Sequence, residues 1–163
     1  MKIFGLVQDS IVDGPGFRFS CFVQGCPHHC PGCHNPESHD PNGGKEMTVE
    51  EVAAELLKNP LTDGLTLSGG DPFAQSEDCL ALARIAHENN LNVWAYSGWT
   101  FEYLRDQGSE GQKALLAEVD VLVDGPFLME QRSLALPWRG SRNQRVIDVP
   151  ASLAAGEAVI RPD

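Results

Sequence analysis

Short runs in which apolar and polar residues alternate recur along the chain and predict β-strands. The first is FRFSCFVQ at residues 17–24, where apolar side chains at every second position are separated by mostly polar neighbours. Comparable runs follow at intervals: GLTLS at 64–68, LNVWAYS at 91–97 and VDVLVD at 119–124. QRVIDV at 144–149 is a further candidate strand.

Segments with helical periodicity lie between these runs: TVEEVAAELLKN at 48–59, SEDCLALARIAHENN at 76–90 and SEGQKALLAE at 109–118. Two of them open with a capping box, Thr48 with Glu51 and Ser109 with Gln112. The segment 76–90 carries its apolar residues on one helical face, at positions 79, 82, 83 and 86. The sequence therefore predicts helices that alternate with strands.

Alternating strands and helices favour parallel strands joined by right-handed crossovers. The expected strands end in glycine-containing turns: QGC at 24–26, SGG at 68–70, SGW at 97–99 and DGP at 124–126. In parallel α/β sheets and barrels such turns meet at one edge, where these folds place their sites. About four βα units fit, or five if 144–149 is included, whereas a closed barrel needs eight units and about 250 residues. We therefore expect one α/β domain over 1–163, an incomplete, laterally open (βα) barrel.

Charge and composition limit the partners and the cellular location that we expect for this protein. The net charge of −11 argues against a nucleic-acid backbone as partner, because no basic run compensates it. The sequence has no apolar run of the roughly 20 residues needed to cross a bilayer, and MKIFGLVQDS lacks the features of a secretory signal. We expect a cytoplasmic protein, in which a cysteine-rich loop favours a metal or redox site over disulfides.

That loop is GCPHHCPGCHN at 25–35, in which Cys26, Cys30 and Cys33 follow the first predicted strand. Buried structural cysteines are disfavoured, because a run of Cys, Pro, His and Gly cannot form a core strand or helix. A zinc site would complete its ligands with a histidine, namely His28, His29, His34 or His39. An iron–sulfur cluster suits three thiolates gathered by a tight loop.

The iron–sulfur interpretation has a chemical consequence. A cubane normally takes four cysteines, so three would leave one iron free to bind a substrate or cofactor. Cys21 and Cys79 are not candidates for the missing ligand. Each falls on the apolar face of its predicted element, and we expect both to be inert core residues.

The motifs together resemble a known family. The C-x3-C-x2-C spacing is similar to the cluster motif of radical S-adenosylmethionine enzymes. Further segments resemble the activating enzymes of glycyl-radical enzymes: DGPG at 13–16, NGGKE at 42–46 and LSGGDP at 67–72. Two more resemble, in particular, activating proteins of anaerobic ribonucleotide reductase: VDVLVDGPF at 119–127 and WRGSRNQRVID at 138–148. The resemblance covers almost the whole chain.

The resemblance implies a [4Fe–4S] cluster on Cys26, Cys30 and Cys33. S-adenosylmethionine would chelate the fourth iron through its amino and carboxylate groups. One electron from the reduced cluster would cleave it to methionine and a 5′-deoxyadenosyl radical, which removes a Cα hydrogen from a glycine of the partner. That partner would be the catalytic subunit of anaerobic ribonucleotide reductase. The electron would come from a low-potential donor such as flavodoxin.

The resemblance also implies contacts to the cofactor. Gly69, Gly70 and Asp71 of SGGDP would receive the methionine amino group, and the remaining candidates would lie beside adenine or ribose: Gly32, Cys33, His34, Ser97 and Asp124. SGGDP would be explained equally well by a plain strand–turn–helix connection with Pro72 near the helix start.

The C-terminal segment 128–163 carries Arg139, Arg142 and Arg145 in an otherwise acidic chain. We expect this segment to help dock the partner, although ordinary surface salt bridges would explain the arginines equally well. Other functions stay open at this point. They are activation of another glycyl-radical enzyme of the pyruvate formate-lyase type, a non-catalytic zinc module that binds a protein, and an iron–sulfur electron carrier.

Overall fold

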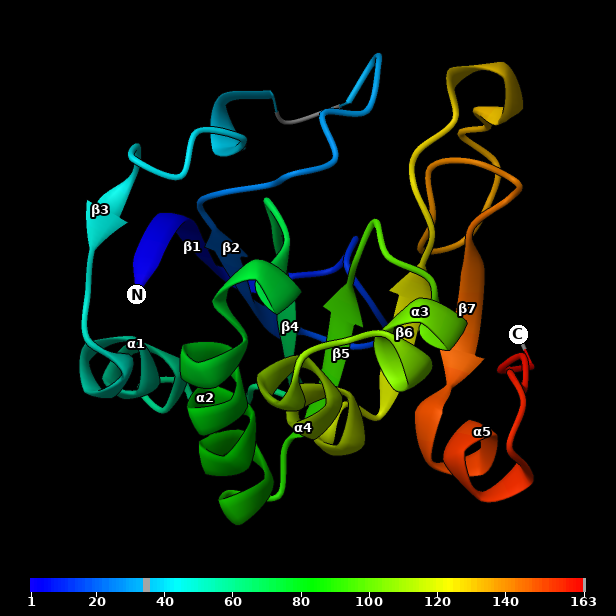
Figure 1. The fold of residues 1–163 in the computed structure, drawn as a ribbon. Coiled ribbons are helices and arrows are strands. Elements are labelled where there is room, and N and C mark those ends of the chain that lie inside the picture. The colour runs from blue at the N-terminus through cyan, green and yellow to red at the C-terminus, as the bar shows by residue number, and fades with distance from the viewer. Residues whose placement is uncertain (34–35, 163) are drawn as a thin grey trace.

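A computed structural model describes residues 1–33 and 36–162 and places its strands in one open sheet (Figure 1). The strands are β1 (Lys2–Ser10), β2 (Arg18–Val23), β3 (Lys45–Glu46), β4 (Gly64–Gly69), β5 (Asn92–Tyr96), β6 (Val121–Asp124) and β7 (Arg145–Asp148). Their order across the sheet is β3-β1-β2-β4-β5-β6-β7. Neighbours among β2, β4, β5 and β6 are parallel, while β1, β3 and β7 add antiparallel pairs at the two sides.

The helices lie on one face of this sheet (Figure 1). They are α1 (Val49–Leu56), α2 (Ser76–Glu88), α3 (Phe101–Asp106), α4 (Glu110–Glu118) and α5 (Val149–Ala155), with short 3-10 turns η1 (Pro36–Ser38), η2 (Pro72–Gln75) and η3 (Met129–Gln131). Both predicted capping boxes are present, Thr48 with Glu51 at α1 and Ser109 with Gln112 at α4. The sequence did not predict α3, which Thr100 caps, or α5, which Asp148 caps.

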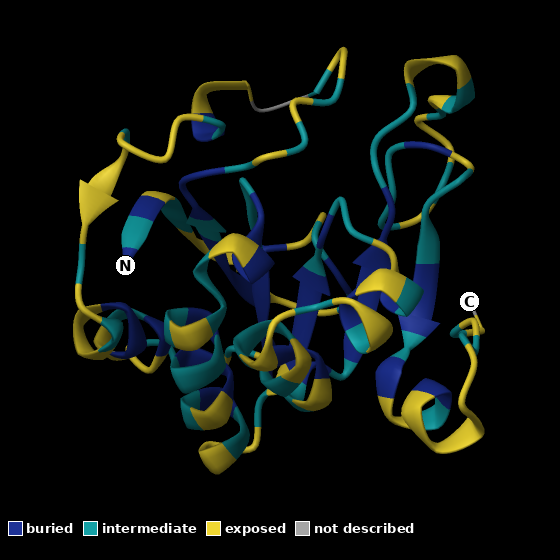
Figure 2. Ribbon diagram, in the orientation of Figure 1, coloured by how far each residue is buried: buried dark blue, intermediate teal, exposed yellow. Residues whose placement is uncertain are grey.

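The two faces of the sheet differ in chemistry. The face beneath the helices is apolar, and its strand residues join helix residues in one core: Phe19, Cys21, Leu65, Leu67, Val93, Ala95, Leu122 and Ile147. The opposite face mixes a smaller apolar cluster around Trp94 and Val123 with buried polar residues, among them Arg18, Ser20 and Thr66. Figure 2 shows the buried positions concentrated in the strands and on the inward sides of the helices. Alternation along each strand produces this division.

The predicted α/β class is confirmed, with parallel strands in an open arrangement that is consistent with the expected incomplete barrel, and two details need correction. The segment 144–149 does not begin a fifth parallel unit, because β7 runs antiparallel to β6, with Leu122 opposite Ile147. Residues 2–10, for which no strand was predicted, form β1, and its pairing with β2 is interrupted by register shifts. Those irregularities weaken the alternation from which strands are recognised.

The parallel strands all end at the same edge, as predicted. Beyond this edge the cysteine loop and the segment 125–144 project on the same side of the molecule, toward the top of Figure 1. We call residues 128–144 the 128–144 loop. Among the described residues, none of the helices has the length and apolar character required to pass through a membrane.

Candidate functional site

The cysteine loop begins where β2 ends and is anchored at its base by the chain that follows it. Gly25 has a positive φ of 100°, and its N–H donates to the Ser38 carbonyl at 2.6 Å. The Cys26 N–H donates to the His39 carbonyl at 3.1 Å, and the Cys33 N–H donates to the Cys30 carbonyl at 3.0 Å. The loop therefore closes back on itself and keeps all three cysteines at one end of the sheet.

Cys26, Cys30 and Cys33 line a common cavity of about 130 Å³. The strand ends complete its wall with residues that include Ser68, Gly69, Gly70, Tyr96, Ser97, Gly98, Gly125, Phe127 and Gln144. Burial, reinforced by the charge of Asp71 and by Cys30, raises the pKa of the Cys26 thiol. Across residues 1–33 and 36–162, no three His, Cys, Asp or Glu side chains are gathered tightly enough for a single metal ion.

Gly69 and Gly70 bring bare backbone to this cavity. Gly69 has φ of +96°, and a β-carbon there would lie 2.5 Å from the Val23 nitrogen. A β-carbon on Gly70 would overlap the Gly25 carbonyl oxygen, because the end of β4 packs directly against the base of the cysteine loop. Both positions therefore require glycine. Both residues also line the smaller cavity, where their backbone is available to a ligand.

A larger cavity of about 420 Å³ adjoins the first. The two share lining residues, namely Cys33, Ser68, Gly69, Tyr96, Phe127 and Gln144. The larger cavity adds Asp13 of the DGPG motif and Trp138 and Arg139 of the 128–144 loop. Burial raises the pKa of the Tyr96 phenol, so its hydroxyl stays protonated at neutral pH. Together the cavities offer a thiol-lined end and a wider aromatic and polar end.

Asp71 is buried and is surrounded by protein hydrogen-bond donors. One carboxylate oxygen, Oδ1, accepts from the Phe73 N–H and caps η2. The other oxygen, Oδ2, accepts from the His28 imidazole, the Ser97 hydroxyl and the Gly98 N–H. Ser97, which was predicted to lie beside the adenine or ribose of the cofactor, lines the smaller cavity. Direct contacts of Asp71 and Ser97 with a cofactor stay predictions.

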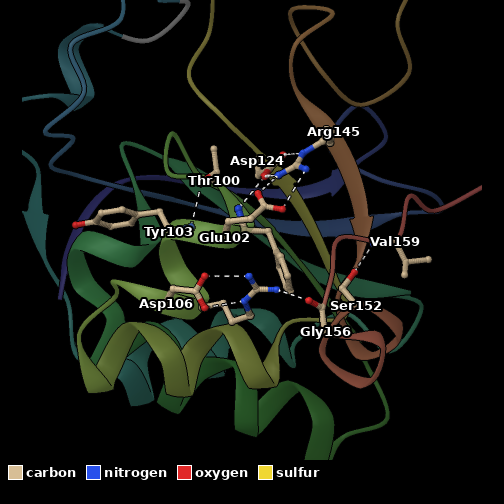
Figure 3. Close-up of polar contacts among 11 residues, drawn as sticks. Thr100, Glu102, Tyr103, Asp106, Asp124, Arg145, Ser152, Gly156 and Val159 are labelled. Carbon is tan, nitrogen blue, oxygen red and sulfur yellow. Dashed lines mark hydrogen bonds and ion pairs between the residues drawn. The ribbon is translucent and has the colours of Figure 1, made fainter.

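Asp124 and Arg145 are brought together, although the sequence suggested separate roles for them. Arg145 donates from Nε to Asp124 Oδ1 at 3.1 Å and from Nη2 to both Asp124 Oδ2 and Glu102 Oε1 at 2.5 Å (Figure 3). Asp124 also accepts from the Phe101 N–H at the start of α3. The Asp124 side chain is 1% exposed. This arrangement ties α3 to β6 and β7, so the Arg145 guanidinium is engaged within its own fold.

The other predicted residues are distributed around the cavities. Gly32 is exposed with φ of +75°, and a β-carbon there would overlap the Met129 sulfur. Arg139 lines the larger cavity and donates to the Gln144 carbonyl, whereas Arg142 is exposed. His34 lies outside the described residues.

Cys21 and Cys79 are fully buried in the core, as expected. Burial raises the pKa of Cys21 to about 12 and that of Cys79 well above its usual value, so both remain neutral thiols. The three loop cysteines differ from them because they are half-buried and face a cavity. Three soft sulfur donors and bare glycine backbone that line one cavity fit an iron–sulfur cluster with one open position.

Sequence reasoning missed several residues of the site. Tyr96 and Phe127 line both cavities, and Gln144 holds the 125–144 segment through bonds to Gly125, Gly140 and Ser141. A signal for Tyr96 existed in the alternation of β5, which places it on the face opposite the helices. Gln144 lies in the WRGSRNQRVID segment that carries the resemblance, but its partners are set by how that segment folds back.

Comparison with known proteins finds relatives along most of the chain. Residues 12–147 match the family described as the 4Fe-4S single cluster domain. The chain is 37% identical over 142 residues to an anaerobic ribonucleoside-triphosphate reductase-activating protein of Vibrio cholerae, covering 82% of this chain and 89% of that protein.

Proteins of the same name from other sources are similar. The Escherichia coli K12 protein is 37% identical over 146 residues, covering 83% of this chain and 91% of its own length. The enterobacteria phage T4 protein is 35% identical over 145 residues, covering 83% of this chain and 86% of its own length. With this identity over most of both chains, and with the thiol-lined cavity in place, the chain belongs to the family of anaerobic ribonucleoside-triphosphate reductase-activating proteins.

Proposed function

We propose that this protein activates the catalytic subunit of an anaerobic ribonucleotide reductase by generating a glycyl radical on it. Cys26, Cys30 and Cys33 would hold a [4Fe–4S] cluster, and S-adenosylmethionine would occupy the adjoining cavities. When bound, the two groups supply one-electron cleavage of the sulfonium and a radical that abstracts hydrogen. The observation that carries the proposal is that the three cysteines and the Gly69–Gly70 backbone line one cavity.

The protein's own contribution is to position these groups and shield them from solvent. A cavity of 130 Å³ is smaller than the roughly 300–1,000 Å³ of most small-molecule sites, whereas 420 Å³ lies within that range. The cofactor would therefore extend from the cysteines across Gly69 and Tyr96 into the larger cavity. Gly69 and Gly70 would present backbone to its methionine end, and Phe127 and Tyr96 would offer apolar surface.

The partner would approach from the side on which the 128–144 loop projects. Met129 and Leu134 of this loop are exposed apolar residues, and Arg142 adds a positive charge. We expect Arg142→Glu to weaken binding to the reductase subunit. Lys113→Glu on the exposed surface of α4 makes the same change in net charge and serves as the control. Equal affinities of the two variants would contradict docking through Arg142.

The deciding experiment mixes anaerobically reconstituted protein, dithionite, S-adenosylmethionine and the catalytic subunit of an anaerobic ribonucleotide reductase. Electron spin resonance should show a glycyl doublet, and Cys30→Ala should abolish it. Pyruvate formate-lyase in place of the reductase tests the related activity and should give no doublet. One zinc per chain, with no absorbance near ~400 nm, would instead support a zinc module. The electron donor in the cell, which we propose to be a low-potential protein such as flavodoxin, can replace dithionite.

A further inference from the structure

His28 lies between two of the proposed cluster ligands, Cys26 and Cys30, and its side chain reaches the ends of β4 and β5. Its Nε2 is 2.7 Å from Asp71 Oδ2. The same oxygen accepts from the Ser97 hydroxyl and the Gly98 N–H, so we assign the imidazole as a third donor to it. The His28 side chain is 15% exposed and that of Asp71 is fully buried. The contact is therefore shielded from water, where a hydrogen bond to a charged group is strongest.

Asp71 connects this imidazole to both neighbouring strand ends. The Ser97 hydroxyl donates to the same Oδ2 at 2.9 Å and the Gly98 N–H donates at 3.0 Å. Oδ1 is held by the Phe73 N–H at 3.0 Å. One buried carboxylate thus joins the cysteine loop, the turn after β4 and the turn after β5. The turn after β4 is the one that carries Gly69 and Gly70.

The imidazole lines the smaller cavity and is confined by two further neighbours, Trp99 and Gly98. The His28 and Trp99 rings meet edge to face, with centroids 4.6 Å apart and planes at 77°. Gly98 lies against the ring so closely that a β-carbon there would overlap His28 Cδ2. The position therefore has no room for a side chain while His28 holds its place. Hydrogen bonding and packing select the same rotamer of His28.

We propose that His28 is a positioning residue, which acts through Asp71 to fix the cysteine loop relative to the Gly69–Gly70 edge. This inference rests on the proposed function. A cofactor that must meet both the open iron and the glycine backbone needs these two elements at a set separation. Asp71 acts in this arrangement through His28, Ser97 and Gly98. Its own contact with the cofactor is not required.

The chain offers closely matched variants. In His28→Asn the side chain is polar but too short to reach Asp71, whereas in His28→Gln the amide retains the reach and the donor. The control is His29→Asn at the next residue, whose ring contacts His39 and whose φ of 47° asparagine tolerates. After anaerobic reconstitution, iron content should be the same in all four proteins. The Kd for S-adenosylmethionine, measured by equilibrium dialysis, should rise about tenfold or more in His28→Asn.

The same Kd should be largely restored in His28→Gln and unchanged in His29→Asn. Gly98→Ala provides a second perturbation, because its methyl group displaces the imidazole without removing it. Alone it should weaken cofactor binding, but in the His28→Asn background it should add little. Additive effects of the two substitutions would contradict the inference. So would wild-type affinity in His28→Asn, or a loss of iron that accounts for its loss of binding.

A measurement on cluster-free protein separates this inference from the proposed function. Hydrogen exchange of the segment 26–33 should be faster in His28→Asn than in the wild type or in His29→Asn, because the loop has lost its buried anchor. Unchanged exchange would overturn the positioning role. If wild-type protein with a full cluster failed to bind S-adenosylmethionine, the proposed function would fall, and the exchange comparison would still decide whether His28 fixes the loop.

Discussion

Replacing Arg145 with methionine should destabilise the fold substantially, without touching either cavity wall. The substitution keeps an unbranched apolar stem but removes the guanidinium that bridges Asp124 and Glu102 (Figure 3). Asp124 would keep the Phe101 N–H on Oδ2 and lose the donors from Arg145 on both oxygens. Because Asp124 is 1% exposed, water cannot readily replace them.

The size of the effect follows from that burial. Removing one partner of a fully buried ion pair costs about 3–5 kcal/mol. Arg145 is 33% exposed, so part of the penalty is relieved by solvent, and we expect about 2–3 kcal/mol. Glu102 is the matched comparison, because it bonds the same guanidinium but is 44% exposed. Glu102→Gln should therefore cost below about 1 kcal/mol.

Equilibrium urea unfolding of cluster-free protein at pH 7, followed by circular dichroism, measures both variants. Arg145→Met should lower the urea midpoint much more than Glu102→Gln, with similar slopes. Hydrogen bonding to Arg145 lowers the pKa of Glu102, so its contribution is present above the ordinary glutamate pKa. It should be lost as pH falls through the lowered value. Equal destabilisation by the two variants would refute the argument from burial.

Further predictions test the core, the glycine edge and one surface cluster. Cys79→Ser should cost about 1–3 kcal/mol in urea unfolding, because it buries a hydroxyl in apolar surroundings, yet iron content should not change. Gly70→Ala should weaken S-adenosylmethionine binding about tenfold or more in equilibrium dialysis, since its methyl group displaces the base of the cysteine loop. Gly5→Ala should leave S-adenosylmethionine binding unchanged, because the added methyl group meets open space. Burial opposes protonation of His87, but its bonds to Asp120 and Glu118 outweigh burial and raise its pKa. In urea unfolding, wild type should therefore be more stable than His87→Gln by less than about 1 kcal/mol. This difference in free energy of unfolding should be fully present below pH ~6.5 and should shrink as the pH rises through the raised pKa. An advantage that grew with pH would contradict this.

Local patterns in the sequence predicted many of the strands and helices. Alternation located β2, β4, β5 and β6, and capping residues located the starts of α1 and α4. These features depend on neighbours within a few residues, so they can be recognised before the chain is folded. The cysteine spacing is local in the same sense, and it pointed to the chemistry that the family comparison supports.

Other features required the folded chain. The direction of β7 could not be read from QRVIDV, because a strand reads the same whether its neighbour is parallel or antiparallel. Asp124 and Arg145 were assigned to different roles because they lie 21 residues apart and meet only when β7 pairs with β6. The sequence also gave no indication that His28 would be bound by Asp71, 43 residues further on.

The sequence by itself determined which residues would face the core, where elements would begin and which thiols could act together, because these depend on periodicity and spacing. Tertiary structure alone decided which charges are paired, which turns touch and which groups share a cavity. Those contacts arise when crossovers bring distant strand ends to one edge of the sheet. There, Asp71 and Asp124 are buried and bonded to side chains that lie far from them in the sequence.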